Sequence, residues 1–189
     1  MKNLKESQSG QSLLEVVIAL TILVMALSAV LALTTSNIVG QKESEFQIVA
    51  NNLAREGIEV VRSIRDSNWL AGVAWDEGLT DATKNVATAE FDIVTNTWSL
   101  NFDFTDDLLY ISSGLSRGLY SHDGSGQPSE FRRILTLDDI CLDDGETIEV
   151  SPPCSTGQKI GVKVTSEVSW LERGRDRQVT LESFLYAWK

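Results

Sequence analysis

The chain of 189 residues has few prolines, one histidine, two cysteines and a shortage of positive charge. Its three prolines begin only at Pro128, and because proline interrupts helices, the long stretch before it can form one unbroken helix. The lone histidine and the two cysteines supply too few ligands for a typical zinc site. No glycine-rich phosphate loop is found at a strand–helix junction. These shortages argue against zinc-based and nucleotide-based chemistry.

Positive charge is scarce, since 16 lysines and arginines stand against 27 aspartates and glutamates, a net charge of −11. So acidic a surface repels phosphate backbones, because nucleic-acid affinity depends on lysine and arginine contacts. The local exception is the triplet Arg173, Arg175 and Arg177, which we interpret as a solvated turn. We therefore expect no direct nucleic-acid binding.

A long apolar run lies near the start of the chain. Val16 to Leu33 is eighteen residues without an ionisable side chain, interrupted by polar residues only at Thr21 and Ser28. A transmembrane helix needs about 17–25 such residues, and we predict a membrane segment at about 14–35. Glu15 stands at the edge of the run, where exposure to lipid would cost at least about 2–3 kcal/mol. A charged residue whose exposure to lipid costs this much free energy is by default a candidate functional residue.

The residues around this glutamate, Gly10-Gln11-Ser12-Leu13-Leu14-Glu15 followed by the apolar run, resemble the processing motif of type IV pilin-like proteins. In that family a dedicated prepilin peptidase removes a short basic leader after a glycine, and a glutamate follows shortly after the cut. The resemblance implies a leader of residues 1–10, cleavage between Gly10 and Gln11, N-methylation of the new amino group, and a role for Glu15 in assembly. The chain departs from the family at Gln11, where phenylalanine is usual.

A signal peptide and a plain signal anchor are the two alternative interpretations of the apolar run. A secretory signal peptide has an apolar core of about 7–15 residues followed by a small-residue cleavage site, whereas this run is longer and offers only poor sites around Ala29 to Thr34. A plain signal anchor accounts for the hydrophobicity but not for the glycine and glutamate before it. Lys2 and Lys5 precede the run and no lysine or arginine follows until Lys42, so the positive-inside rule predicts a cytoplasmic N-terminus.

Helical periodicity continues beyond the membrane segment. Apolar residues recur at steps of three and four between Ile38 and Ile64, with charged residues on the opposite face. We therefore predict one helix over residues 11–66, about 80 Å long at about 1.5 Å per residue. Its first half would face lipid or identical helices. Its second half would lie against an extracytoplasmic, β-rich domain formed by residues 67–189.

From Ser67 onward the pattern changes to the period-two alternation of strands. The clearest pair alternates through Ile160–Trp170, turns at Arg173-Gly174-Arg175 and returns through Gln178–Tyr186. The other predicted strands are Glu90–Val94, Thr97–Phe104, Leu108–Ser112 and Phe131–Leu137. Strands grouped after one helix indicate an α+β fold, with an antiparallel sheet that covers the outer half of the helix. The closing hairpin also resembles the C-terminal strands of minor pilins and pseudopilins.

The two cysteines, Cys141 and Cys154, bracket a polar loop, Leu142–Pro153. An even pair in an exported domain indicates a disulfide, and free thiols are the alternative. Closing so short a loop would stabilise the fold by about 3 kcal/mol in the chain-entropy model.

Nothing in the sequence predicts an enzyme or a cofactor. The only histidine, His122, lies in the segment Ser121–Gly126, which we interpret as a turn, because neighbouring residues cannot converge as a catalytic triad does. A cluster of aspartates is a weak candidate for calcium through oxygen ligands: Asp138, Asp139, Asp143 and Asp144. Its spacing does not match an EF-hand, and a solvated acidic loop is the alternative.

The resemblance implies a filament subunit. The expectation is a type IV pilus-like subunit, a minor rather than a major pilin, whose partners are other pilin subunits, the prepilin peptidase, the inner-membrane assembly platform and the membrane itself. Before assembly it would be a single-pass protein of the inner membrane, and afterwards it would lie in an extracytoplasmic or cell-surface filament. A type II secretion pseudopilin and a membrane-anchored binding domain that never polymerises are the two alternatives.

Overall fold

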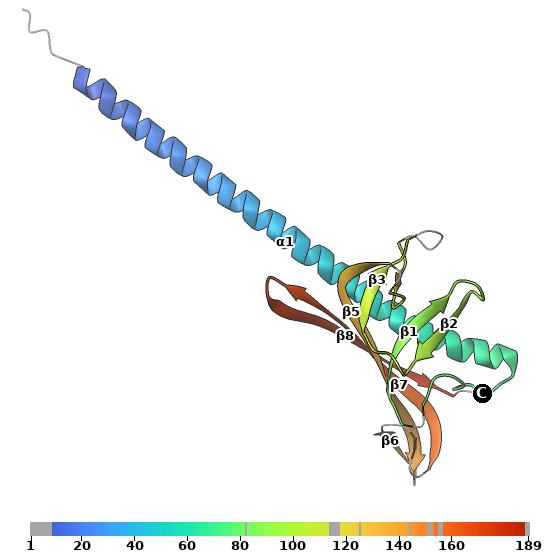
Figure 1. Cartoon of the computed structure of the whole chain (residues 1–189). Coiled ribbons are helices and arrows are strands. Elements are labelled where there is room, and N and C mark those ends of the chain that lie inside the picture. Colours follow the sequence, from blue (N-terminus) through green and yellow to red (C-terminus); the bar gives the residue numbers. More distant parts are fainter. Residues whose placement is uncertain are drawn as a thin grey trace, which may run out of the picture. The chain divides into compact units, whose positions relative to one another are not determined.

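The computed structural model describes residues 9–81, 83–113, 118–124, 126–143, 145–150, 153–154 and 157–187. Within them a long helix, α1 (Ser9–Ala71), is followed by strands. The strands are β1 (Val86–Asp92), β2 (Thr97–Asn101), β3 (Leu108–Ile111), β4 (Tyr120–Ser121), β5 (Gln127–Asp143), β6 (Glu146–Val150), β7 (Gln158–Glu172) and β8 (Arg175–Tyr186). They form one eight-stranded sheet (Figure 1). The chain divides into two compact units, Met1–Phe46 and Gln47–Lys189.

The helix ends at a glycine. Gly72 has a positive φ of 73°, a conformation that glycine adopts without steric cost. The Gly72 N–H donates to the Trp69 carbonyl (3.2 Å) and the Val73 N–H to the Asn68 carbonyl (3.1 Å). These bonds satisfy carbonyls of the last turn and form the Schellman motif that commonly closes helices. The helix therefore extends to Ala71, beyond the predicted end near Asp66, because the stop signal is the glycine and not the polar residues before it.

Strand β5 is the centre of the antiparallel sheet. One of its edges pairs with β7 over most of its length, from Phe131 opposite Trp170 to Leu142 opposite Gln158. Its other edge pairs in succession with β3, β1 and β6, while β2 extends β1 and β4 extends β3. The predicted α+β fold with an antiparallel sheet is confirmed.

Strands β7 and β8 form the hairpin that the sequence predicts. Glu172 pairs with Arg175, which leaves Arg173 and Gly174 as a two-residue loop. Both loop residues have positive φ, 50° and 74°, as a type I′ turn requires. Because such a turn matches the twist of the flanking strands, the hairpin remains regular over twelve residue pairs.

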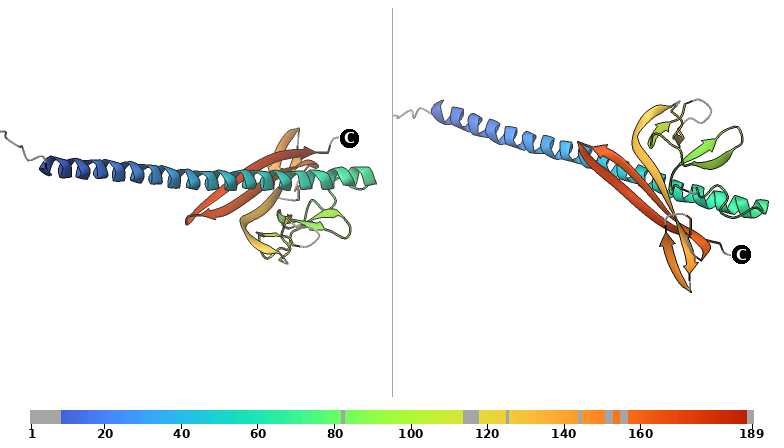
Figure 2. Two further views of the ribbon diagram at one scale, coloured as in Figure 1. Left: turned by 90° about the horizontal axis from the view of Figure 1, so that it is seen from above. Right: turned by 60° about the horizontal axis from the view of Figure 1, so that its bottom comes forward.

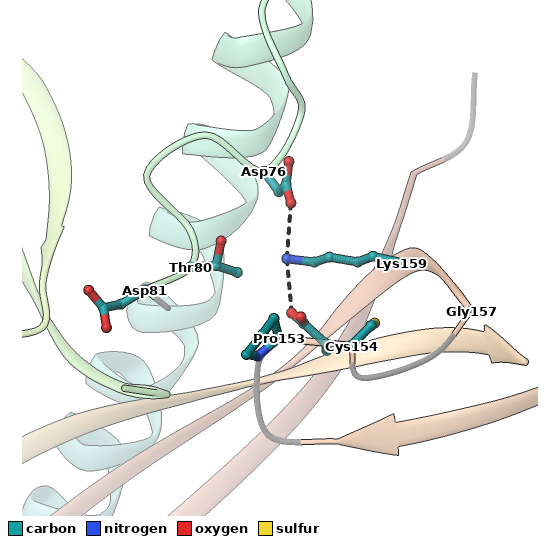
Figure 3. A pocket seen from close by; sticks show the side chains of 8 residues that line it. Asp76, Thr80, Asp81, Pro153, Cys154, Gly157 and Lys159 are labelled. Carbon is teal, nitrogen blue, oxygen red and sulfur yellow. Dashed lines mark ion pairs between the residues drawn. The ribbon is translucent and has the colours of Figure 1, made fainter. Parts of the chain in front are cut away.

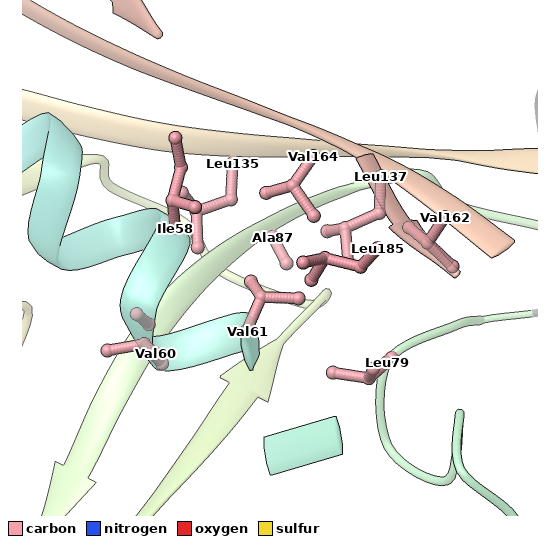
Figure 4. Close-up of a cluster of buried hydrophobic side chains, with 11 residues drawn as sticks. Ile58, Val60, Val61, Leu79, Ala87, Leu135, Leu137, Val162, Val164 and Leu185 are labelled. Atoms are coloured by element: carbon pink, nitrogen blue, oxygen red, sulfur yellow. The ribbon is translucent and has the colours of Figure 1, made fainter. Parts of the chain in front are cut away.

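The core of the second unit lies between α1 and one face of the sheet (Figure 4). Its buried members come from α1, the α1–β1 connection and four strands: Ile58, Val60, Val61, Leu79, Ala87, Ala89, Leu135, Leu137, Val162, Val164 and Leu185. Helix and sheet approach each other closely at Gly57, where a Cβ atom would come within 2.7 Å of both Leu135 Cδ2 and Ser166 Oγ. Trp75, from the α1–β1 connection, packs against this cluster.

Candidate functional site

The first segment of α1 exposes its apolar side chains. The large apolar residues from Leu13 to Leu33 are 50–70% exposed in this unit. By length and composition α1 can cross a membrane, and no part of its most apolar stretch is buried inside the protein. The segment is therefore a candidate single-pass membrane anchor, in agreement with the predicted apolar helix.

The hydroxyl groups in this segment are satisfied by the helix itself. The Thr21 hydroxyl donates to the Val17 carbonyl (2.7 Å) and the Ser28 hydroxyl to the Val24 carbonyl (2.8 Å). Thr34 and Thr35 bond the carbonyls four residues earlier in the same way. Because a bilayer offers no water to polar groups, this internal bonding lowers the cost of placing them in lipid.

Glu15 differs from these hydroxyl residues because it carries a charge. Its side chain is exposed, and it is the only ionisable residue between Glu6 and Lys42. Gly10 and Gln11 lie in the first turn of α1, where the backbone N–H groups have no intrahelical acceptor. Glu15 follows Gln11 by one helical turn, about 6 Å along the axis. Cleavage after Gly10 and the role of Glu15 in assembly stay predictions.

The disulfide predicted from the sequence is present. Cys141 on β5 is bonded to Cys154, thirteen residues later, and their Cα atoms are 6.0 Å apart. Cys141 is fully buried. The bond joins β5 to the segment before β7, so it fastens one end of the sheet. The expected loop between the cysteines contains strand β6, paired with β5.

A cavity of about 450 Å³ lies beside this disulfide, between the α1–β1 connection and the start of β7 (Figure 3). Lys159 reaches across it and makes ion pairs with Asp76 Oδ2 (3.0 Å) and Asp139 Oδ1 (2.9 Å). Its Nζ is also 5.4 Å from the centre of the Trp75 ring. The lysine therefore ties the α1–β1 connection to β5, and the cavity is crossed by a cation that the protein itself supplies.

Two of the four calcium candidates are engaged within the protein. Asp139 is 2% exposed and pairs with Lys159, and Asp138 accepts a hydrogen bond from the Asn85 amide (2.9 Å). Asp144 and the Asp143 side chain lie outside the described residues. Among those described, no group of three or more His, Cys, Asp or Glu side chains is placed to hold a metal ion.

A buried arginine on β5 was not predicted from the sequence. The Arg133 side chain is fully buried, and its Nη1 donates to the Leu53 carbonyl and to Glu56 Oε1, both at 3.2 Å. Burial lowers the pKa of Arg133, and Glu56 opposes this effect. The period-two alternation contained the signal, because Arg133 has the same parity as Phe131 and Leu135, which are buried.

His122 is more enclosed than the predicted turn suggests. Burial, together with the positive charge of Arg133, lowers its pKa from 6.5 to about 4. The imidazole is therefore neutral at pH 7. It is a largely enclosed side chain that feels the charge of the buried arginine.

No protein-family model, curated protein or solved structure matches the chain. The structure itself gives one long apolar N-terminal helix and an antiparallel sheet packed on its second part, which is compatible with a pilin fold.

Proposed function

We propose that the chain is a subunit of a type IV pilus-like filament, matured by prepilin peptidase cleavage after Gly10. The observation that supports this proposal is that α1 has two segments with different surroundings. One segment is apolar, exposed and headed by a single acidic residue, and the other is covered by the sheet. An apolar helix that its own chain leaves uncovered requires lipid or other helices around it, and a membrane followed by a filament supplies both.

The proposed mechanism pairs two charges from different copies. Cleavage creates an α-ammonium group on Gln11, which keeps its positive charge when methylated. In a stack of subunits, the Glu15 carboxylate of one copy lies beside the Gln11 ammonium of its neighbour. Neither ion finds water among packed apolar helices, so removing one partner costs about 3–5 kcal/mol. The pair therefore sets the register of the helices, while the apolar side chains form a heterologous interface that repeats into an open filament.

This proposal places the protein first in the inner membrane, with its N-terminus cytoplasmic, and then in an extracytoplasmic filament. Its partners are the peptidase, the assembly platform and other pilin subunits. Within the pilins we propose a minor rather than a major subunit, because the sequence of the closing β7–β8 hairpin resembles that of minor pilins and pseudopilins.

The test replaces Glu15→Leu in the full chain expressed with its assembly system. We expect normal cleavage after Gly10 and a drop of roughly tenfold or more in the amount found in sheared filaments, since the lost pair is worth several kcal/mol. Glu45→Leu is the matched control, because Glu45 is also exposed on α1 but lies beyond the apolar run. Entry of the Glu15→Leu chain into filaments at the wild-type level would overturn the mechanism.

The mass of the mature N-terminus separates the alternatives. A chain that begins at methylated Gln11 supports the proposal, and an uncut chain favours the anchored domain that never polymerises. A pseudopilin would be cut in the same way but would copurify with secretion pseudopilins instead of a major pilin.

A further inference from the structure

Three ionisable side chains from distant parts of the second unit meet beside the disulfide. Lys159 lies at the start of β7, Asp139 on β5 and Asp76 in the α1–β1 connection. In Figure 3 the Lys159 side chain ends between its two ion pairs, with Nζ at 2.9 Å from Asp139 Oδ1 and at 3.0 Å from Asp76 Oδ2. One amine therefore stands against two carboxyl groups, a combination that supplies a nucleophile, an acyl carbon and a proton carrier.

The pairing of β5 with β7 puts the lysine within reach of Asp139. Lys159 is opposite Cys141, two residues along β5 from Asp139, and diagonal neighbours at this spacing are within reach of a long side chain. The register of the two strands shifts between Ile140 and Cys141, and such irregularities re-aim side chains. The contact is therefore held by two paired strands of the sheet.

The Asp139 carboxyl group is shielded from water and is not held by a hydrogen bond. Its side chain is only 3% exposed, and among the described residues its Oδ1 has no hydrogen-bond partner. The approach of Lys159 Nζ at 2.9 Å is therefore an ion-pair contact that is not aligned as a hydrogen bond. Because burial penalises both charges, passage of a proton from the ammonium to a carboxylate removes two buried charges at once.

The distance between the two groups suits a reaction between them. Asp139 Oδ1 is one bond from the carboxyl carbon, Cγ, so Lys159 Nζ is close to the separation of about 3–3.5 Å that reacting atoms have in near-attack geometries. Groups oriented in this way inside one molecule have effective concentrations of about 10⁵–10⁸ M. Such concentrations favour the condensation of two groups that stay separate in dilute solution.

We propose that Lys159 and Asp139 join covalently, as an amide bond between the lysine Nζ and the aspartate Cγ, with loss of one water molecule. Nζ gives up a proton, attacks Cγ, and gives up a second proton as the carbon–oxygen bond breaks. Asp76, the second carboxyl group in contact with Nζ, carries the protons to the leaving oxygen. An ammonium and a carboxylate together contain the atoms of one amide and one water, so the step needs no other reactant.

This crosslink goes beyond the proposed function and does not depend on it. It joins β5 directly to β7 and encloses the Cys141–Cys154 disulfide, because residues 139 and 159 flank both cysteines. Thiols reduce disulfides but do not cleave amides. The end of the sheet therefore stays closed when the disulfide is reduced.

The test digests the full chain with trypsin, after purification in detergent and after reduction and alkylation of the disulfide. Trypsin cleaves after lysine and arginine, and the sequence has neither between Arg133 and Lys159. An unlinked chain therefore releases residues 134–159 at full mass, a result that would overturn the proposal. A linked lysine resists trypsin, so we expect residues 134–163 as one peptide that is lighter by one water molecule, with fragments that place the link between Asp139 and Lys159.

Two variants separate the roles of the side chains. Lys159→Arg keeps the positive charge but removes the amine, and should abolish the loss of water. Asp76→Asn removes the proton carrier and should slow formation of the link about 100-fold, since general acid–base catalysis contributes about 10²–10⁴-fold. A pulse of isotope-labelled amino acids follows the rate, and an unchanged rate would overturn the role of Asp76. Lys163→Arg is the matched control on the same strand, where Lys163 pairs with the exposed Glu182 (3.4 Å), and should leave the link unchanged.

A second source of water loss lies in the same peptide. An Asp-Gly sequence such as Asp144-Gly145 can close to a cyclic imide with loss of one water. The imide opens in mild alkali, leaves Lys159 cleavable by trypsin and persists in Lys159→Arg, whereas the proposed amide has none of these properties. A lighter peptide that behaves as the imide would overturn the proposal.

Discussion

The two segments of α1 belong to one helix but differ in the exposure of their apolar side chains. Before Phe46 the large apolar side chains are exposed, as at Leu23 (53%), whereas in the second unit Leu53 and Val61 are 3% and 0% exposed. Their local sequences are both helical and both apolar on at least one face. The difference is that the second segment has strands of its own chain to lie against, and the first does not. Helix formation in α1 therefore follows from the local sequence, whereas burial of a segment depends on whether strands pack against it.

The stability of the second unit can be measured separately in the intact chain, because all five tryptophans lie beyond residue 68. In detergent micelles, unfolding followed by tryptophan fluorescence therefore reports the second unit. Substitutions in the first segment should leave this signal unchanged, and substitutions in the core should move it.

The largest difference is expected between two leucines. Leu135→Ala removes a fully buried side chain from the core and should lower the free energy of unfolding by about 2–5 kcal/mol, since it creates a cavity. Leu23→Ala, in the exposed segment, should change it by less than about 0.5 kcal/mol. Urea titration of the two chains makes the measurement. Equal effects would mean that the exposed segment is part of the same cooperative unit.

Two glycines of α1 offer a smaller and sharper contrast. A Cβ at Gly57 meets Leu135 Cδ2 and Ser166 Oγ at 2.7 Å, and one at Gly40 meets nothing within 4 Å. Overpacking costs about 1–3 kcal/mol and outweighs the gain of up to about 1 kcal/mol in helix propensity. Gly57→Ala should therefore lower the urea midpoint, while Gly40→Ala leaves it unchanged. A stabilised Gly57→Ala chain would show that helix and sheet have room between them.

The smallest effect concerns pH and is again confined to the second unit. The pKa of His122 is lowered to about 4 in the folded protein, against about 6.5 when unfolded. Between these values the unfolded chain binds the extra proton, so the free energy of unfolding falls as the pH drops from about 6.5 to 4. With allowance for partial exposure, the loss is about 1–2 kcal/mol. His122→Gln should flatten this part of the stability profile, and an unchanged slope would contradict the burial of the ring.

Much of the fold follows from patterns that are local in the sequence. Helical periodicity predicts α1 because apolar residues recur at its own repeat, and alternation predicts the β7–β8 hairpin together with its arginine–glycine turn. Strand β6 was missed because Glu146–Val150 lies between turn-forming residues and becomes a strand only through its pairing with β5. Arg133 was missed as a buried residue, although its position in the alternation points inward, because composition assigns arginine to the surface.

Some features of the candidate site could likewise be predicted from the sequence, and others could not. Gly10, Glu15 and the apolar run lie close together in the sequence, so the motif they form can be recognised without knowledge of the tertiary structure. The ion-pair partners of buried charged residues cannot be predicted from the sequence. Lys159 pairs with Asp76 and Asp139, and Arg133 pairs with Glu56, across long sequence separations.

The sequence by itself determined a long apolar helix with one charge at its start, followed by antiparallel strands, and it favoured a disulfide over free thiols. These features depend on periodicity, on spacing and on the scarcity of proline and cysteine. Only the tertiary structure decided that Arg133 is buried against the second half of the helix and that Lys159 crosses the cavity beside the disulfide. The physical reason is that Lys159 and Arg133 meet partners far away in the sequence, and no local pattern specifies those partners.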